Sequence, residues 1–358
     1  MKKVSILTGS LIVGMTSSVF AGGYESNALS TSFMYEQAGE MNAYAEVAYG
    51  SRSYDVTGTT YAPTGSAVKD QTSTTISVRY DVTDNISIGF TNYNQGNIQL
   101  DYSEAGGAGA ALLPVVDMAI DARVLMTKYS LSDNIGFLAG VKQTVVKDST
   151  ADIFRAGGIQ ASSITGGNEI GYVYGAVYTR DDIAMRVELT METSTDFSLA
   201  TANASAGAGT TTGSTPDYMN LYFQSGIAED TLLYGSMRTA NWSENQLTVH
   251  PHTTPTSSFT DSTTYSLGLG RKFTDNFSGS VNLSGEPKGA TASDTPLTIT
   301  NGYQGVTVGG KYTIDNMSIT AGYNYTQVGD VSLSTALGDG EFTDNKITGF
   351  GVRVGFKF

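Results

Sequence analysis

Residues 306–326 read VTVGGKYTIDNMSITAGYNYT, two runs of alternating residues on either side of Asp315-Asn316. In the first run, Val308 and Tyr312 share one face and polar residues occupy the other. Alternation with a period of two is the signature of a β-strand with one apolar and one polar side. Asp and Asn favour tight turns, because their short side chains bond the local backbone and tolerate left-handed conformations. The stretch therefore predicts two antiparallel strands joined by a tight turn.

The same pattern occurs six times, with gaps of 49, 48, 48, 46 and 40 residues between successive turns. Six tight turns at one end of a sheet need seven longer connections at the other, which gives fourteen strands. Short turns on one side and long loops on the other are typical of a transmembrane β-barrel. The six turns are Asp84-Asn85, Asp133-Asn134, Asp181-Asp182, Glu229-Asp230, Asp275-Asn276 and Asp315-Asn316.

The turns and the alternation set the bounds of the expected strands. Many of them are much longer than the soluble norm of about 5–6 residues. This length argues against the soluble alternative, a β-sandwich or β-solenoid with one wet face. Residues 200–216, of low complexity, are expected to be a mobile loop. The expected strands are 42–54, 72–82, 86–102, 118–131, 135–147, 168–180, 183–199, 217–227, 231–249, 263–273, 277–285, 302–314, 317–333 and 346–358.

The first residues predict export. Lys2 and Lys3 precede a short apolar stretch that ends in Val19-Phe20-Ala21, which has the form of a cleavage site. We therefore expect residues 1–21 to be a signal peptide, whose removal changes the net charge from −14 to −16. A strongly acidic exported chain is a poor partner for nucleic acid. The chain also has no cysteine, which excludes disulfides and thiolate metal sites.

The last strand ends on an alternating row that includes Val352, Val354, Phe356 and Phe358. A terminal Phe after such a strand resembles the recognition signal of the outer-membrane barrel assembly machinery. The resemblance implies that this machinery is a partner during biogenesis. Phe358 could equally be one more residue that faces lipid.

Six further stretches, in the order in which they occur, resemble the FadL-type transporters of hydrophobic compounds. That family includes channels for long-chain fatty acids and for aromatic hydrocarbons. The resemblance covers essentially all of the chain after residue 21. The stretches are GGYESNALSTSFMYE at 22–36, NAYAEVAYG at 42–50, PDYMNL at 216–221, TLLYGS at 231–236, YSLGLGRKFTDN at 265–276 and GVRVGF at 351–356.

This resemblance implies a fourteen-stranded antiparallel barrel at 41–358 with an N-terminal hatch, residues 22–40, folded inside it. It implies a monomer in the outer membrane of a Gram-negative bacterium that takes up hydrophobic small molecules passively, with long-chain fatty acids as the first candidates. One motif departs from the family, because the chain has Ser26-Asn27-Ala28 where well-studied members have Asn-Pro-Ala. A general porin for polar solutes is the alternative, and it would require an open lumen.

The third expected strand has an irregular outward row. Ile86, Ile88 and Phe90 are followed on the same side by Asn92, Asn94 and Gly96, and then by Ile98, Leu100 and Tyr102. Polar side chains facing lipid are costly, and Gly permits a bulge or an inward bend. In the FadL-type family an inward kink of this strand opens a lateral gap, so the resemblance implies such a gap at Asn92, Asn94 and Gly96. An ordinary bulge, or a stretch above the hydrocarbon zone, is the alternative.

No catalytic constellation, cofactor motif or metal site stands out, and His250 and His252 are interpreted as solvated loop residues. Apolar residues of the hatch and outer loops are candidate ligand contacts, although packing would explain them equally. The candidates are Phe33, Met34, Tyr35, Phe154, Ile159, Phe197 and Leu199. Charged residues on lumen-facing rows could hold the hatch or bind a carboxylate. They are Arg79, Lys142, Arg186, Glu188, Lys272, Lys311 and Arg353.

Overall fold

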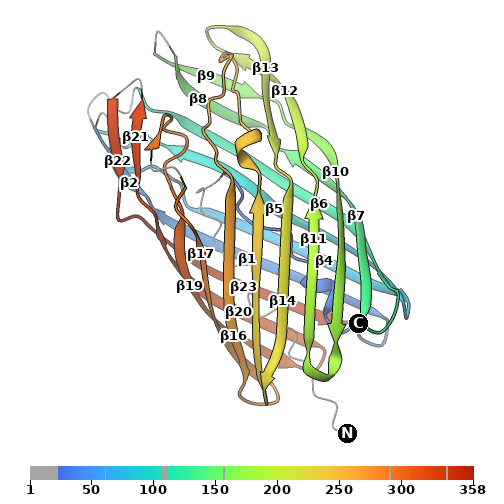
Figure 1. Cartoon of the computed structure of the whole chain (residues 1–358). Coiled ribbons are helices and arrows are strands. Elements are labelled where there is room, and N and C mark those ends of the chain that lie inside the picture. Colours follow the sequence, from blue (N-terminus) through green and yellow to red (C-terminus); the bar gives the residue numbers. More distant parts are fainter. Residues whose placement is uncertain (1–22, 61, 107–111, 156–157, 290–291, 336–337) are drawn as a thin grey trace.

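The computed structural model describes residues 23–60, 62–106, 112–155, 158–289, 292–335 and 338–358. Fourteen antiparallel strands close into a barrel, with the tight turns at one end and extended loops at the other (Figure 1). We call these the turn end and the loop end. The predicted fold class and strand number are confirmed. The expected signal peptide, residues 1–21, lies outside the described residues.

Each barrel strand pairs with the next, and β1 pairs with β23 to close the wall, as in Val47 opposite Val354. All six predicted turns join paired strands, and Asp230 and Asp315 adopt left-handed φ angles of 55° and 49°. The barrel strands are β1 (Ala43–Asp55), β4 (Gln71–Thr83), β5 (Ile86–Asp101), β6 (Val115–Ser130), β7 (Ile135–Val146), β10 (Gly167–Arg180), β11 (Met185–Glu192), β14 (Tyr218–Ala228), β15 (Thr231–Ala240), β16 (Ser262–Lys272), β17 (Phe277–Glu286), β19 (Tyr303–Ile314), β20 (Met317–Val328) and β23 (Lys346–Lys357).

Three predicted strands are too long, because barrel strands β11, β15 and β20 end at Glu192, Ala240 and Val328. Beyond these ends the alternation continues in loop structure that also has one buried face. Residues 200–216, predicted to be a mobile loop, form most of a hairpin in which Phe197 pairs with Gly213. The loop-end strands are β2 (Thr57–Thr60), β3 (Ala62–Ser66), β8 (Ser149–Arg155), β9 (Gly158–Ile164), β12 (Thr195–Asn203), β13 (Gly207–Thr215), β18 (Ala292–Ser293), β21 (Val331–Thr335) and β22 (Gly338–Phe342).

In the described part of the chain, the helical elements are the short 3₁₀ turns η1 (Ser32–Tyr35), η3 (Asp181–Ile183) and η4 (Trp242–Glu244). Within the described residues, no helix is long and apolar enough to cross a membrane.

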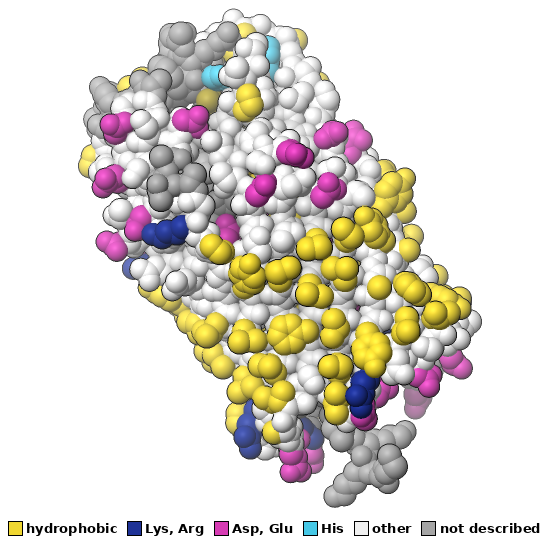
Figure 2. Space-filling model, viewed as in Figure 1, with side chains coloured by type: hydrophobic (Ala, Val, Ile, Leu, Met, Phe, Trp, Pro, Cys, Tyr) yellow, Lys and Arg dark blue, Asp and Glu magenta, His cyan; other side chains and the backbone are white. Residues whose placement is uncertain are grey.

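The outer surface of the barrel carries a belt of exposed apolar side chains, bordered by acidic residues (Figure 2). Val308 and Tyr323 on neighbouring strands are 58% and 53% exposed, whereas the adjacent inward residues Thr307 and Asn324 are 1% and 3% exposed. A soluble protein would reverse this arrangement. An apolar exterior with a polar interior is what a bilayer requires of a barrel wall.

We predict that Val308→Arg, near the middle of β19, lowers the free energy of unfolding by about 2–4 kcal/mol, because it places a charge in the apolar belt. The same change at Ile314, the last residue of β19, should cost only about 0–1 kcal/mol, because the side chain can reach the interface. Denaturant titration of both variants in lipid vesicles tests this. Equal costs at the two positions would contradict a membrane assignment of the belt.

Candidate functional site

Residues 23–40, which we call the N-terminal segment, run inside the barrel from beneath the outer loops to the turn end. Phe33 and Met34 of η1 are fully buried and pack with Val124 and Met126 of β6. Gly89 of β5 makes room for them, since a Cβ at this position would lie 2.2 Å from Met34 Sδ. Phe33 and Met34 therefore serve as packing that holds the segment against the wall.

Inward-facing charges hold the segment near η1. Arg79 donates hydrogen bonds to the backbone oxygens of Met34 (2.9 Å) and Glu36 (2.5 Å), and Lys311 pairs with the Glu36 carboxylate at 3.5 Å. The Thr31 hydroxyl donates to Glu188 at 2.5 Å.

The phenol ring of Tyr35 lies against a cation. The Arg186 guanidinium lies 4.1 Å from its centroid and also covers the Tyr222 ring. Burial, followed by the charge of Glu188, raises the pKa of the Tyr35 phenol, which therefore stays protonated.

A chain of four charges, three of them buried and Glu25 partly buried, anchors the segment nearer the loop end. Glu25 pairs with Arg238 through bonds of 2.5 and 3.1 Å, Arg238 reaches Glu192 at 3.0 Å, and Glu192 pairs with Lys142 at 3.2 Å. The Lys142 and Glu192 side chains are 0% and 3% exposed, so each depends on its partner. Arg238 was not among the predicted lumen residues. Leu232 and Leu233, at the start of β15, are both apolar, so the alternation there does not show which face of the strand points inward.

The start of the described segment is fixed by aromatic packing. Tyr24 makes edge contacts with Trp242 and Phe259 at centroid distances of 4.6 and 5.6 Å. Its hydroxyl donates to the backbone oxygen of Ser214 at 2.7 Å, and burial raises the pKa of this phenol. The outer loops and the N-terminal segment therefore form one packed unit.

A β-bulge interrupts β5 at Gln95. Asn94 pairs with Asp121 of β6, but Gly96 pairs with Ile120, so Gln95 is an extra residue. An extra residue inverts the faces of a strand. The prediction that Gly96, Ile98, Leu100 and Tyr102 continue the outward row is therefore wrong. Gly96 pairs beside the inward-facing Ile120, and Ile98, Leu100 and Tyr102 are 4%, 2% and 0% exposed.

The outward residues Asn92 and Asn94 lie at the edge of the apolar belt. Their neighbours on the same level are polar, namely Arg123 opposite Asn92, Gln143 opposite Arg123, and Asn168, which accepts a bond from Gln143 at 3.1 Å. The side chain of Asn94 also bonds to Asn97. Asn94, Arg123, Gln143 and Asn168 therefore have hydrogen-bond partners, which avoids the cost of unpaired polar groups in hydrocarbon.

Backbone pairing between β4 and β5 stops at Ile76 opposite Asn92. The pairing resumes only nearer the loop end, before β4 begins, where Lys69 N donates to Gln99 O at 3.1 Å. Residues 71–75 and 93–97 between these points are not paired with each other, and we call this interruption the window. On its inner side the N-terminal segment pairs with β5 instead, through Ser26 N to Gln95 O (2.8 Å) and Asn97 N to Tyr24 O (3.1 Å).

Gly96 is required for this contact. A Cβ on Gly96 would lie 2.7 Å from both the backbone oxygen and the ring of Tyr24. Its role is therefore close backbone approach, and not an unusual φ angle.

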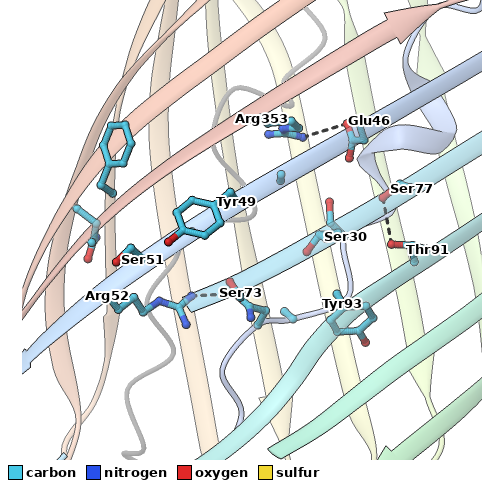
Figure 3. Close-up of a pocket in the computed structure, with 18 residues that line it drawn as sticks. Ser30, Glu46, Tyr49, Ser51, Arg52, Ser73, Ser77, Thr91, Tyr93 and Arg353 are labelled. Atoms are coloured by element: carbon cyan, nitrogen blue, oxygen red, sulfur yellow. Dashed lines mark hydrogen bonds and ion pairs between the residues drawn. The ribbon is translucent and has the colours of Figure 1, made fainter. Parts of the chain in front are cut away.

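A pocket lies in the lumen beside the window (Figure 3). It holds about 900 Å³ of empty space, open solvent included. Small polar side chains share its wall with the aromatic rings of Tyr49, Tyr93 and Phe350, and Glu46, Arg52 and Arg353 are its charged members. The lining side chains include Asn27 and Ser30 of the N-terminal segment, Ser73, Thr75 and Ser77 of β4, and Thr91 and Tyr93 of β5.

A second, apolar pocket of about 350 Å³ lies above the window, beneath the outer loops. Tyr24, Ile98 and Leu100 form the side nearest the window. The other lining residues are Leu247, Ser257, Phe259, Leu297 and Ile299.

The remaining predicted residues are dispersed. Phe197 and Leu199 are 5% and 4% exposed and belong to the apolar cluster beneath the outer loops, so they offer no exposed capture surface. Phe154 and Ile159 pair across β8 and β9, and their side chains lie outside the described set. Lys272 lies at the turn end and pairs with Asp275, away from the N-terminal segment.

Neither His250 nor His252 belongs to a metal-binding group. Across the described part of the chain, no cluster of three or more His, Asp or Glu residues could hold a metal ion.

No family model and no curated protein matches the sequence. Solved structures do match. A FadL homologue from Pseudomonas aeruginosa superposes with a TM-score of 0.77, covering 98% of both chains at 15% identity. The chain has the fold of this FadL homologue. The P. putida toluene transporter TodX gives a TM-score of 0.66 at 11% identity, covering 91% of this chain and 92% of its own. The Ralstonia pickettii toluene transporter TbuX gives 0.64 at 10% identity, covering 92% of each. The FadL-type fold predicted from the sequence is thereby confirmed.

We predict that Arg238→Gln loosens the N-terminal segment while the barrel remains folded, because Glu25 and Glu192 lose their shared partner. Breaking a buried ion pair on one side costs about 3–5 kcal/mol. Hydrogen exchange should accelerate in peptides covering residues 23–40, and the heat-dependent gel mobility of the barrel should be unchanged. Arg180→Gln is the matched control, since its pair with Asp182 is exposed. Equal protection of residues 23–40 in both variants would show that the network does not hold the segment.

Proposed function

We propose that the protein is a passive outer-membrane channel for hydrophobic small molecules, which leave the barrel sideways through the window. The observation that supports this most strongly is the interruption between β4 and β5. A barrel wall in a bilayer normally pairs all of its backbone groups. Here residues 71–75 and 93–97 forgo that pairing, and the N-terminal segment provides partners for β5 from inside.

The arrangement of pockets supports a route from the loops to the window. The apolar pocket beneath the outer loops and the lumenal pocket lie on either side of the contact between the N-terminal segment and β5. Tyr24 lines the first, and Asn27 lines the second. A ligand would pass from one to the other by shifting this short stretch of chain.

The level of the window fits release at the outer boundary of the hydrocarbon region. Below it, Ile76 and Phe90 are exposed members of the apolar belt, and beside it the outward residues are polar. A ligand leaving there would enter the bilayer near its outer interface, past the polar surface layer. The stretch is both bulged and at the edge of the belt, as the alternative interpretation expected, and we propose that the unpaired seam beside it is the exit.

Long-chain fatty acids are our first candidate substrates. The similar solved structures include a protein described as a FadL homologue and two described as toluene transporters, and toluene is an apolar ligand. The N-terminal segment disfavours a general porin, because it is anchored across the lumen by buried ion pairs. We further propose that residues 22–40 act as the hatch, that residues 1–21 direct export, and that the chain is a monomer inserted by the barrel assembly machinery.

We predict that Gly96→Val abolishes uptake of a labelled long-chain fatty acid by cells that lack their own transporter. The new side chain would collide with Tyr24 and displace the N-terminal segment from β5. Gly289→Val is the matched control, because its Cβ would meet its nearest neighbours at 3.5 and 3.7 Å, an ordinary contact. Uptake by the Gly96 variant equal to that of the control, with both barrels inserted, would remove the window from the mechanism.

Because the chain has no native cysteine, a single introduced thiol can be labelled selectively at the window. Thr75→Cys places a thiol on the lumenal pocket at the unpaired edge of β4. Attachment of a bulky thiol reagent should reduce uptake at least several-fold, because it fills the proposed exit. The same variant before labelling and the cysteine-free parent treated with reagent are the controls. Full uptake after complete labelling would argue that ligands do not leave beside Thr75.

A further inference from the structure

The lumenal pocket beside the window has an unbalanced charge. Three charged side chains line it, and two of them neutralise each other, since Arg353 pairs with Glu46 at 3.6 Å. Glu46 also accepts a hydrogen bond from the Tyr44 hydroxyl at 2.9 Å. The third is Arg52, which has no carboxylate within ion-pair distance among the described residues. The pocket therefore carries one net positive charge.

Arg52 is instead held by neutral groups, since its side-chain partners are the Tyr54 hydroxyl and the Asn27 amide. Its Nη2 donates to the Oδ1 atom of Asn27 at 2.8 Å, and Figure 3 shows its side chain extending from β1 toward β4. Asn27 in turn donates through Nδ2 to the backbone oxygen of Asn94 at 2.7 Å. One chain of hydrogen bonds thus connects β1, the N-terminal segment and the bulge of β5, across the inside of the window.

A carboxylate is a better acceptor for Arg52 than an amide. A guanidinium can donate two parallel bonds to a carboxylate, and charge-assisted bonds are roughly twice as strong as neutral ones. The rest of the pocket suits a polar head group, because Ser30, Ser73 and Thr75 line it with hydroxyls. A single cation without a carboxylate partner matches one negative charge and disfavours a dianion.

We propose that Arg52 recognises the carboxylate head group of an amphipathic ligand in this pocket. The carboxylate replaces the Asn27 amide oxygen as the acceptor of Arg52, which frees Asn27 and loosens the N-terminal segment from the bulge. The head group is then held at the window, while the apolar tail is free to enter the bilayer. This inference rests on the proposed channel function and narrows its ligands to monocarboxylates.

The test compares two labelled probes of equal chain length, palmitate and palmityl alcohol, by equilibrium dialysis against the full protein in non-ionic detergent. Arg52→Gln should weaken palmitate binding about 10- to 100-fold, which is the range for a lost hydrogen bond to a charged group. It should change alcohol binding less than about 2-fold. Arg271→Gln, at an exposed position on β16, removes the same charge outside the pocket and should alter neither probe.

A second variant tests the exchange of acceptors. Asn27→Asp gives Arg52 a resident carboxylate, so it should also weaken palmitate selectively, although Arg52 is retained. The folded barrel is verified for each variant by its heat-dependent gel mobility. Equal loss of both probes in Arg52→Gln, or undiminished palmitate binding in either variant, overturns the assignment and leaves the channel proposal standing. If the unmodified protein binds and transports neither probe, both proposals fail.

Discussion

Hydrogen bonding of the backbone controls this structure, because hydrocarbon offers no partner to a free N–H or C=O. Of the fourteen pairs of neighbouring barrel strands, thirteen have backbone pairing without a long interruption, including β1 with β23, which closes the barrel. The seam between β4 and β5 is the exception, and there residues 24–27 supply partners from within to the β5 side. The N-terminal segment is therefore part of the wall as well as a filling of the lumen. Any movement of this segment changes the wall at the window.

Because the wall at the window depends on the position of the N-terminal segment, the segment must be held in place. The charges buried inside the barrel serve this purpose. Removing an ion from water is costly unless a partner and further hydrogen bonds replace the water. Glu25, Arg238, Glu192 and Lys142 satisfy one another in sequence, while Arg79 and Lys311 satisfy Glu36 and the nearby backbone. Such networks fix position more than they add stability, since apolar packing could supply stability alone. The segment is thus set in one register against β5.

Much of the barrel was predictable from the sequence, because a strand between lipid and a polar lumen must alternate and Asp or Asn marks its turns. The alternation rule assumes that no extra residue interrupts a strand, and the prediction for β5 was wrong because a bulge interrupts it. Gly96 indicated that a bulge was permitted, but nothing in the sequence marks Gln95 as the extra residue. The parity of β5 was therefore followed through the bulge, and Ile98, Leu100 and Tyr102 were placed on the wrong side. Alternation also continued past Glu192 into β12, since that loop strand has a buried face of its own. Pairings between distant residues, such as Glu25 with Arg238, depend on the closed barrel and leave no trace in spacing.

The bulge and the charges of the lumen are connected by a single residue. Asn27 contacts β5 through its backbone and its side-chain amide, and it occupies the acceptor position beside Arg52. An amide is strong enough to order the guanidinium and weak enough to be displaced by a charged group. An Asp at this position would close the pocket to an anion, and an apolar residue would leave both Arg52 and the bulge without their shared contact. Ser26 and Asn27, where the sequence differs from the Asn-Pro-Ala motif that the resemblance led us to expect, both donate backbone bonds to Gln95 of the bulge.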